Sequence, residues 1–179
     1  LLPLIGTVEE THAALAIYKS AFTEKLDALL HAKLGLKTMQ TNDDALIGGL
    51  FSIMQLNHVD FTLFFRRLGD LHIDDTKRDE PLRDLFIDRP AFDAWANQYR
   101  ARLRQESSQD AQRQVEMHAV NPKYVLRNYL AQIAIEKAQN KDFSEIEKLL
   151  SVLEKPFDEQ PENLQYAALP PDWASHLEV

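Results

Sequence analysis

The sequence predicts an all-α protein with about seven amphipathic helices and an extended, proline-rich tail. Apolar residues recur at intervals of three and four over several long segments, which is the spacing of one helix face. Capping residues precede these segments and glycine or proline follows them, while no convincing strand and no internal repeat is present. We expect a helical region over residues 1–155 and an acidic tail over residues 156–179 that packs on the helices.

Size and composition favour one soluble unit. The 179 residues are 45% hydrophobic and 27% charged, and no apolar run approaches the roughly 20 residues that span a bilayer. The start has no basic region and too short an apolar stretch for a signal peptide, so we expect a cytoplasmic protein. Without cysteine, the chain forms neither a disulfide nor a thiolate metal site. Neither a membrane nor nucleic acid is an expected partner, because no basic patch stands out and the net charge is −8.

The first helix is expected over residues 7–34. Thr7 and Glu10 form a Thr-x-x-Glu capping box at its start, and Gly35 can adopt the left-handed conformation that commonly ends a helix. Its apolar residues step by three and four along one face: Leu15, Tyr18, Phe22, Leu26 and Leu29. These features predict a long amphipathic helix.

Two further helices should follow. One runs from Asn42 to Leu56, and its inward residues are expected to be Leu46, Leu50, Ile53 and Met54. Gly48 and Gly49 weaken it by about 1 kcal/mol each relative to alanine, so we expect another backbone to pack closely there. The other begins with Asp60 as its N-cap, ends at Gly69, and is strongly apolar, with Phe61, Phe64, Phe65 and Leu68.

The middle of the chain, from residue 70 to about residue 118, is expected to contain a loop followed by helical segments. Residues 70–80 lack periodicity and indicate a charged surface loop, after which Pro81 opens a brief helical turn. A helix then starts at Asp88, and its apolar face comprises Phe92, Trp95, Tyr99 and Leu103. The densest basic group lies on the same helix and is interpreted as its solvated side: Arg100, Arg102 and Arg104. Residues 107–110 separate this helix from a segment that ends near His118.

The last two helices are expected to begin at Asn121 and Ser144. Asn121 can cap a first turn, and Pro122 loses no intrahelical bond at the next position. The residues expected to face the core there are Leu126, Tyr129, Leu130 and Ile133. Ser144 and Glu147 match a second capping box, and the last helix should stop before Pro156. Its buried stripe is expected to comprise Ile146, Leu149, Leu150 and Leu153.

The tail after Pro156 has a composition of its own. Residues 156–179 hold four of the eight prolines and no glycine, and residues 142–179 carry nine acids against two lysines, a net charge of −7. We therefore expect an extended segment that runs over the helices. Three aromatic residues could pin it there: Phe157, Tyr166 and Trp173.

The sequence assigns no catalytic, cofactor-binding or metal-binding residue. The six histidines lack the i, i+4 pairing and the clustered acids that a zinc site requires: His12, His31, His58, His72, His118 and His176. Asp60 follows His58-Val59 much as aspartate follows His-Arg in protein kinases, but the metal-binding asparagine expected five residues later is Phe65 here. Asp60 is therefore interpreted as a helix cap.

Two other polar groups have structural interpretations. The acids Asp74, Asp75, Asp79 and Glu80 could gather around magnesium, but the interleaved Lys77 and Arg78 favour a self-neutralised loop. Arg127 and Asn128 are interpreted as a partly buried hydrogen-bonding pair that ties the tail or a neighbouring loop. Ser107-Ser108 has no paired base, so no nucleophilic catalyst is visible.

Three segments carry a resemblance to a known family: Asn121-Pro122-Lys123-Tyr124-Val125-Leu126-Arg127-Asn128, Pro156-Phe157-Asp158-Glu159-Gln160-Pro161 and Pro170-Pro171-Asp172-Trp173-Ala174. With these, the chain resembles the carboxy-terminal part of the SelO (selenoprotein O) family of kinase-like protein adenylyltransferases. Less specific matches extend the resemblance to nearly the whole chain: Leu1-Leu2-Pro3-Leu4, Lys33-Leu34-Gly35-Leu36 and Asp60-Phe61-Thr62-Leu63-Phe64-Phe65-Arg66.

The resemblance implies a pseudokinase-like fold in which the full-length protein transfers AMP from ATP to protein hydroxyls with Mg or Mn. The family's nucleotide and metal motifs lie upstream of the matched part, so no catalytic residue is carried over to this chain. The family commonly ends in a tail with cysteine or selenocysteine, which this sequence lacks. The implied partners are the upstream kinase-like catalytic region and the protein substrates of the full-length enzyme.

Three hypotheses follow for this chain. In the first, the helices extend the carboxy-terminal lobe of the kinase-like domain and support its catalytic segments. In the second, they form a non-catalytic protein-interaction module whose acidic tail recruits a partner. In the third, a helical metal-dependent hydrolase is built on the acids between Asp74 and Glu80.

Overall fold

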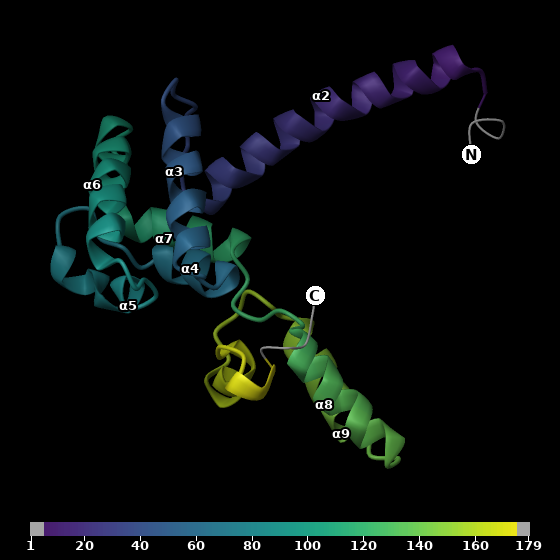
Figure 1. Ribbon diagram of the computed structural model, residues 1–179. Coiled ribbons are helices and arrows are strands. Elements are labelled where there is room, and N and C mark those ends of the chain that lie inside the picture. Colours follow the sequence, from purple (N-terminus) through teal and green to yellow (C-terminus); the bar gives the residue numbers. More distant parts are fainter. Residues whose placement is uncertain (1–5, 175–179) are drawn as a thin grey trace.

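The computed structural model describes residues 6–174, and every regular element in this range is helical (Figure 1). The α-helices are α2 (Val8–Lys33), α3 (Asp43–Leu56), α4 (Phe61–Leu68), α5 (Glu80–Arg83), α6 (Arg89–Gln105), α7 (Asp110–Val120), α8 (Asn128–Gln139) and α9 (Ser144–Leu153). Three 3₁₀-helices accompany them: η1 (Thr76–Asp79), η2 (Pro161–Ala167) and η3 (Asp172–Ala174). The all-α prediction is confirmed over this range. The expectations for residues 1–4 and for His176 lie outside the described residues.

The first hydrophobic core lies between α3, α4 and α6. The apolar face predicted for α6 is entirely buried in it: Phe92, Trp95, Tyr99 and Leu103. Trp95 stacks on Tyr99 with ring centroids 5.2 Å apart, and its indole N–H donates to the Leu46 carbonyl at 3.0 Å. The buried Tyr99 hydroxyl donates to the Leu34 carbonyl at 2.6 Å, which fixes the end of α2 against α6.

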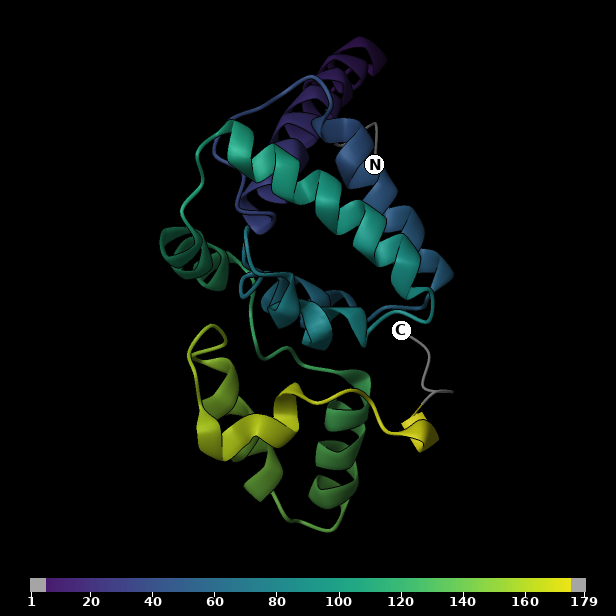
Figure 2. The same ribbon diagram turned by 90° about the vertical axis from the view of Figure 1, so that its left-hand side faces the viewer.

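The second core belongs to the carboxy-terminal part of the chain. It gathers residues of α8, α9 and η2, including Tyr129, Leu130, Leu149, Val152 and Tyr166. Figure 2 shows the α8–α9 hairpin and η2 as a group set apart from α3, α4 and α6. The tail is not continuously extended, because it forms η2 and η3. Tyr166, which was expected to hold the tail on the helices, is buried. Trp173, expected to do the same, packs edge-on against Tyr129 with ring centroids 6.2 Å apart.

Helix α2 projects away from both cores (Figure 1). Its capping box is confirmed, since the Glu10 N–H donates to the Thr7 hydroxyl at 3.2 Å and the Thr7 N–H donates to the Glu10 carboxylate at 2.8 Å. At 1.5 Å per residue, its 26 residues extend about 39 Å. Only His31 in this helix is buried. The amphipathic stripe therefore has no packing partner within residues 6–174.

Among the five glycines, the surroundings of Gly35 differ sharply from those of Gly48 and Gly49. Gly35 has φ of +65°, and a Cβ there would lie 2.6 Å from Cγ of Arg113 and 2.8 Å from Sδ of Met117. In contrast, nothing lies within 4 Å of a Cβ on Gly48, and the nearest atom to one on Gly49 is Cδ1 of Trp95 at 3.9 Å. The close backbone approach expected at Gly48 and Gly49 is therefore wrong, and both are solvent-exposed.

Alanine substitutions at Gly35 and Gly48 are expected to have opposite effects. Gly35→Ala should lower the free energy of unfolding by about 1–3 kcal/mol, because the methyl group is both strained and overpacked. Gly48→Ala should raise it by about 0.5–1 kcal/mol, because alanine restricts the unfolded chain and favours the helix. Urea unfolding followed by circular dichroism measures both. A stabilised Gly35→Ala variant would contradict the left-handed, crowded geometry of that residue.

Two predicted helix starts are wrong. Asn121 ends α7 rather than starting α8, and its fully buried side chain donates to the Lys33 carbonyl at 2.9 Å. The following residues stay non-helical because the N–H groups of Lys123 and Tyr124 donate to the Pro156 carbonyl at 2.8 and 3.1 Å. Ser144 is the first residue of α9 and not its cap, and its N–H is bound by the Asp142 carboxylate at 3.0 Å. A distant partner replaces the local cap at Asn121, whereas at Ser144 the nearby Asp142 side chain accepts a hydrogen bond from the free N–H.

The apolar stripes of the last two helices are only partly buried. Tyr129, Leu130 and Leu149 are buried as expected. Three other residues predicted to face the core are exposed: Leu126, Ile146 and Leu150. They line an apolar groove between α8 and α9.

Candidate functional site

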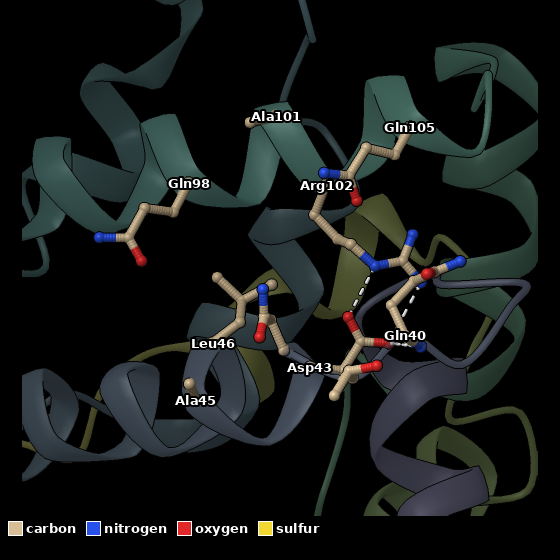
Figure 3. A pocket seen from close by; sticks show the side chains of 10 residues that line it. Gln40, Asp43, Ala45, Leu46, Gln98, Ala101, Arg102 and Gln105 are labelled. Atoms are coloured by element: carbon tan, nitrogen blue, oxygen red, sulfur yellow. Dashed lines mark hydrogen bonds and ion pairs between the residues drawn. The ribbon is translucent and has the colours of Figure 1, made fainter.

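A polar cleft of about 730 Å³ lies between the start of α3 and the second half of α6 (Figure 3). Gln98 and Gln105 approach it from α6, and Gln40 approaches it from the loop before α3. Its lining offers amide, hydroxyl and apolar groups together with one ion pair. None of the lining residues is a nucleophile held by a base, so the cleft is suited to binding polar groups rather than to covalent catalysis.

The ion pair in this cleft joins Asp43 to Arg102. Arg102 Nε donates to Asp43 Oδ1 at 2.6 Å and Nη2 donates to Oδ2 at 3.1 Å (Figure 3). Nη1 of Arg102 donates to Glu106 at 2.9 Å. All three side chains are almost fully buried. Burial by itself would raise the pKa of Asp43, but the hydrogen bonds from Arg102 and from the Gln40 N–H outweigh it and lower that pKa. The pair therefore stays ionised and holds α3 to α6.

The interpretation of the α6 arginines as a solvated face is wrong for two of the three. Arg100 is 3% exposed, and its Nη2 donates to both oxygens of Asp79 at 2.6 Å. Arg102 is 6% exposed, and only Arg104 remains at the surface. Loop 70–80 lies beside α6 and supplies the acids that bind Arg100 and Arg104. The acids that bind Arg102 are Asp43 and Glu106. The many acids in residues 70–80 were the signal in the sequence that could have indicated these ion pairs. The sequence alone did not show that this loop lies beside α6.

In this pairing the acids of loop 70–80 bind arginines and are not gathered as the metal-dependent hydrolase hypothesis expects. Asp79 forms an ion pair with Arg100. Asp74 pairs with Arg104, and Asp75 pairs with Arg78. Within residues 6–174, no three His, Asp or Glu side chains come together as a metal ion would require. The carboxylates of loop 70–80 serve to fasten the loop.

Asp60 has the structural role that the sequence predicts, and Arg127 adds to it. Asp60 caps α4 by accepting from the Leu63 N–H at 2.8 Å. Arg127 lies just before α8 and binds the same carboxylate through two nitrogens, at 2.6 and 3.1 Å. Burial alone would raise the pKa of Asp60, but these hydrogen bonds outweigh it and lower that pKa. The ion pair thus links the first core to the start of the second.

The lowered pKa of Asp60 predicts a loss of stability in acid. A carboxylate with a folded-state pKa below its unfolded value stabilises the fold above the unfolded pKa, and this contribution disappears as the pH falls through the folded pKa. We expect the free energy of unfolding to fall below about pH 4. Asp60→Asn should show a smaller fall than the wild type. The matched variant Asp44→Asn removes an exposed acid of α3 and controls for the loss of one negative charge.

The apolar stripe of α2 is exposed along most of the helix. Its members Leu15, Tyr18, Phe22, Leu26 and Leu29 are 60%, 65%, 52%, 41% and 56% exposed. Tyr18 and Phe22 stack on each other with ring centroids 5.9 Å apart. In residues 6–174 no helix combines the length and the apolar character needed to cross a bilayer. A contiguous apolar patch of this kind marks a contact surface.

Comparisons with known proteins identify the family. The profile of the family described as "Protein adenylyltransferase SelO" matches residues 1–154. The "Protein nucleotidyltransferase YdiU" of Herminiimonas arsenicoxydans is 67% identical over 179 residues, which cover all of this chain and 36% of that protein. Proteins with the same description from Burkholderia ambifaria (strain MC40-6) and Burkholderia vietnamiensis (strain G4 / LMG 22486) are 53% and 52% identical, and the match covers 37% of each. The chain thus spans little more than a third of the length of these relatives. It belongs to the SelO family of protein adenylyltransferases.

Proposed function

We propose that this chain is the helical, non-catalytic part of a protein adenylyltransferase and supports a kinase-like catalytic part that lies outside it. In the complete protein, AMP passes from ATP to the hydroxyl groups of Ser, Thr or Tyr side chains. The family membership supports the transfer chemistry. The one-third coverage of the relatives supports a division between this part and a larger remainder.

The proposal that this chain supports a catalytic part is based on the exposed apolar stripe of α2. An isolated helix is marginally stable in water, and helices in proteins gain most of their stability from packing an apolar face. Fully burying a leucine or phenylalanine side chain contributes about 1.5–3 kcal/mol. Covering this stripe with the remaining part of the protein would therefore stabilise the folded state considerably. In this arrangement α2 joins the catalytic part to the first core.

The ATP and the divalent metal that the transfer would need are proposed to bind outside this chain. Within residues 6–174 there is no cluster of three potential metal ligands, and Gly48-Gly49 lies inside α3 rather than in a phosphate-binding loop. We place the nucleotide and Mg or Mn in the remaining part of the protein. In this proposal the chain contributes by holding the catalytic part in position.

Transfer of label from ATP labelled at the α-phosphate tests this proposal. The 179-residue chain is compared with the same chain joined to the rest of its natural sequence, with Mg or Mn present. Label only in reactions with the longer protein is the expected result. Label transferred by the 179-residue chain alone would contradict the proposal, because it would require an active site within these residues.

A second candidate function is a protein-interaction module without a role in transfer. The groove between α8 and α9 favours it, since this groove has a volume of about 620 Å³ and carries the exposed side chains of Leu126, Ile135, Ile146 and Leu150. Such a groove suits the apolar face of a partner helix. The two functions differ in one outcome: a charged substitution on the α2 stripe abolishes transfer only if α2 contacts the catalytic part.

A further inference from the structure

A cavity of about 690 Å³ lies where α4, the segment after α7 and the tail meet. Its lining holds four cationic side chains, Arg66, Arg67, Lys123 and Arg127, but only two carboxylates, Asp70 and Glu159. The chain as a whole carries a net charge of −8, so this local excess of positive charge is unusual within it. A concave site with converging cations favours anionic ligands.

Two backbone carbonyls hold one nitrogen of the Arg66 guanidinium group. The Arg66 side chain is 9% exposed, and Nη1 donates to the backbone carbonyls of His118 and Asn121 at 2.9 and 3.1 Å. These two acceptors fix the plane of the guanidinium group and leave Nη2 for another partner. A buried guanidinium requires a counter-charge, because an uncompensated buried charge is costly. Nη2 is therefore a preorganised donor for an oxyanion.

Glu159 now supplies that counter-charge. Its Oε1 accepts from Arg66 Nη2 at 2.7 Å, and its Oε2 accepts from Lys123 Nζ. Hydrogen bonds from Lys123 and Arg66 lower the pKa of Glu159, so it is ionised near neutral pH. The Glu159 side chain nevertheless remains 61% exposed, and it lies in a non-helical stretch between two prolines. Water already surrounds most of this carboxylate, so its replacement requires little rearrangement of the cores.

Arg127 is a further cationic side chain in the wall of the same cavity. Two of its nitrogens bind Asp60, while its buried Nε has no hydrogen-bond partner among residues 6–174. Lys123 is 17% exposed, so its ammonium group is also largely removed from bulk water. Charge-assisted hydrogen bonds are stronger in such an environment than at an open surface.

We propose that this cavity binds an oxyanion of the phosphate class, and that Glu159 is an internal competitor for the same donors. The ligand takes the place of the Glu159 carboxylate on Arg66 and Lys123, while the contacts of Arg66 to the α7 carbonyls persist. A tetrahedral phosphate offers more acceptor atoms than a carboxylate and carries more negative charge. The inference is independent of the adenylyltransferase proposal, because it concerns binding by this chain alone.

Isothermal titration calorimetry with inorganic phosphate and with pyrophosphate tests the site, at pH 7.5 and constant ionic strength. Glu159→Gln removes the competing charge and should tighten binding at least about fivefold. Lys123→Met removes a donor and should weaken binding at least about fivefold. Lys148→Met makes the same charge change on the exposed surface of α9 and should leave the affinity at the wild-type value. Tighter binding of pyrophosphate than of phosphate would indicate that a phosphoanhydride is the preferred source of the anion.

Two results would overturn the inference. If Glu159→Gln binds neither ligand more tightly than the wild type, Glu159 is only a structural link between the tail and α4. If Lys148→Met weakens binding as much as Lys123→Met, the anions respond to diffuse charge rather than to this cavity. Circular dichroism of each variant establishes that the helices persist. Glu159→Gln is nearly isosteric and keeps the test valid even if Lys123→Met fails to fold.

Discussion

Replacing Arg102 with alanine is expected to lower the free energy of unfolding by about 3–5 kcal/mol. The substitution leaves the carboxylates of Asp43 and Glu106 buried, at 3% and 4% side-chain exposure, without the guanidinium that binds both. Such a loss is a large fraction of the 5–15 kcal/mol that typically stabilises a domain. Urea unfolding at pH 7, followed by far-ultraviolet circular dichroism, measures the effect.

Arg104→Ala is the matched control for that measurement. It removes the same side chain from the same helix, but Arg104 is 54% exposed and its partner Asp74 is 86% exposed. Exposed ion pairs contribute at most about 1 kcal/mol, so we expect a loss below that value. Equal losses for the two variants would mean that Arg102 behaves as a surface arginine, in contradiction to its burial.

Replacing Phe22 with aspartate is expected to reduce AMP transfer by the longer protein at least about tenfold, because it would place a charge in the apolar contact proposed for α2. The same substitution in the 179-residue chain should change the free energy of unfolding by no more than about 0.5 kcal/mol, since Phe22 is 52% exposed there. Transfer of α-phosphate label measures the first effect, and urea unfolding measures the second.

Ser20→Asp controls for the added charge in α2. Ser20 is exposed and lies almost opposite the apolar stripe, because two residues correspond to about 200° around a helix. Transfer should be unaffected by this variant. Full activity of Phe22→Asp would place the catalytic part elsewhere and favour the interaction-module alternative. A severe loss of stability in the 179-residue chain would instead mean that α2 is already packed.

The sequence was most informative where the structure is local. The box of Thr7 and Glu10, the cap at Asp60 and the left-handed Gly35 all appear where the pattern predicts them. Each depends on atoms within about four residues, so neighbouring side chains suffice to specify it. The buried face of α6 was likewise predictable from its spacing, because a helix has only one periodicity.

The sequence was less informative where a polar residue could choose between a local and a distant partner. Asn121 looks like a helix cap, yet it binds the Lys33 carbonyl 88 residues away. Arg100 and Arg102 look solvated, yet Asp79 and Asp43 approach them from other elements. A sequence pattern does not show whether a polar side chain faces solvent or a distant partner. The partner depends on which segments the fold brings together.

By itself, the sequence determined the helical class of the described residues and, through its resemblance to SelO proteins, the family. The tertiary structure alone decided which apolar faces meet and which remain bare. Periodicity marks the stripe of α2 and the stripe of α6 in the same way, but only α6 finds a core within the described residues. The cavity at Arg66 and Glu159 was equally invisible in the sequence, because these residues lie 93 positions apart and meet only after both cores have formed.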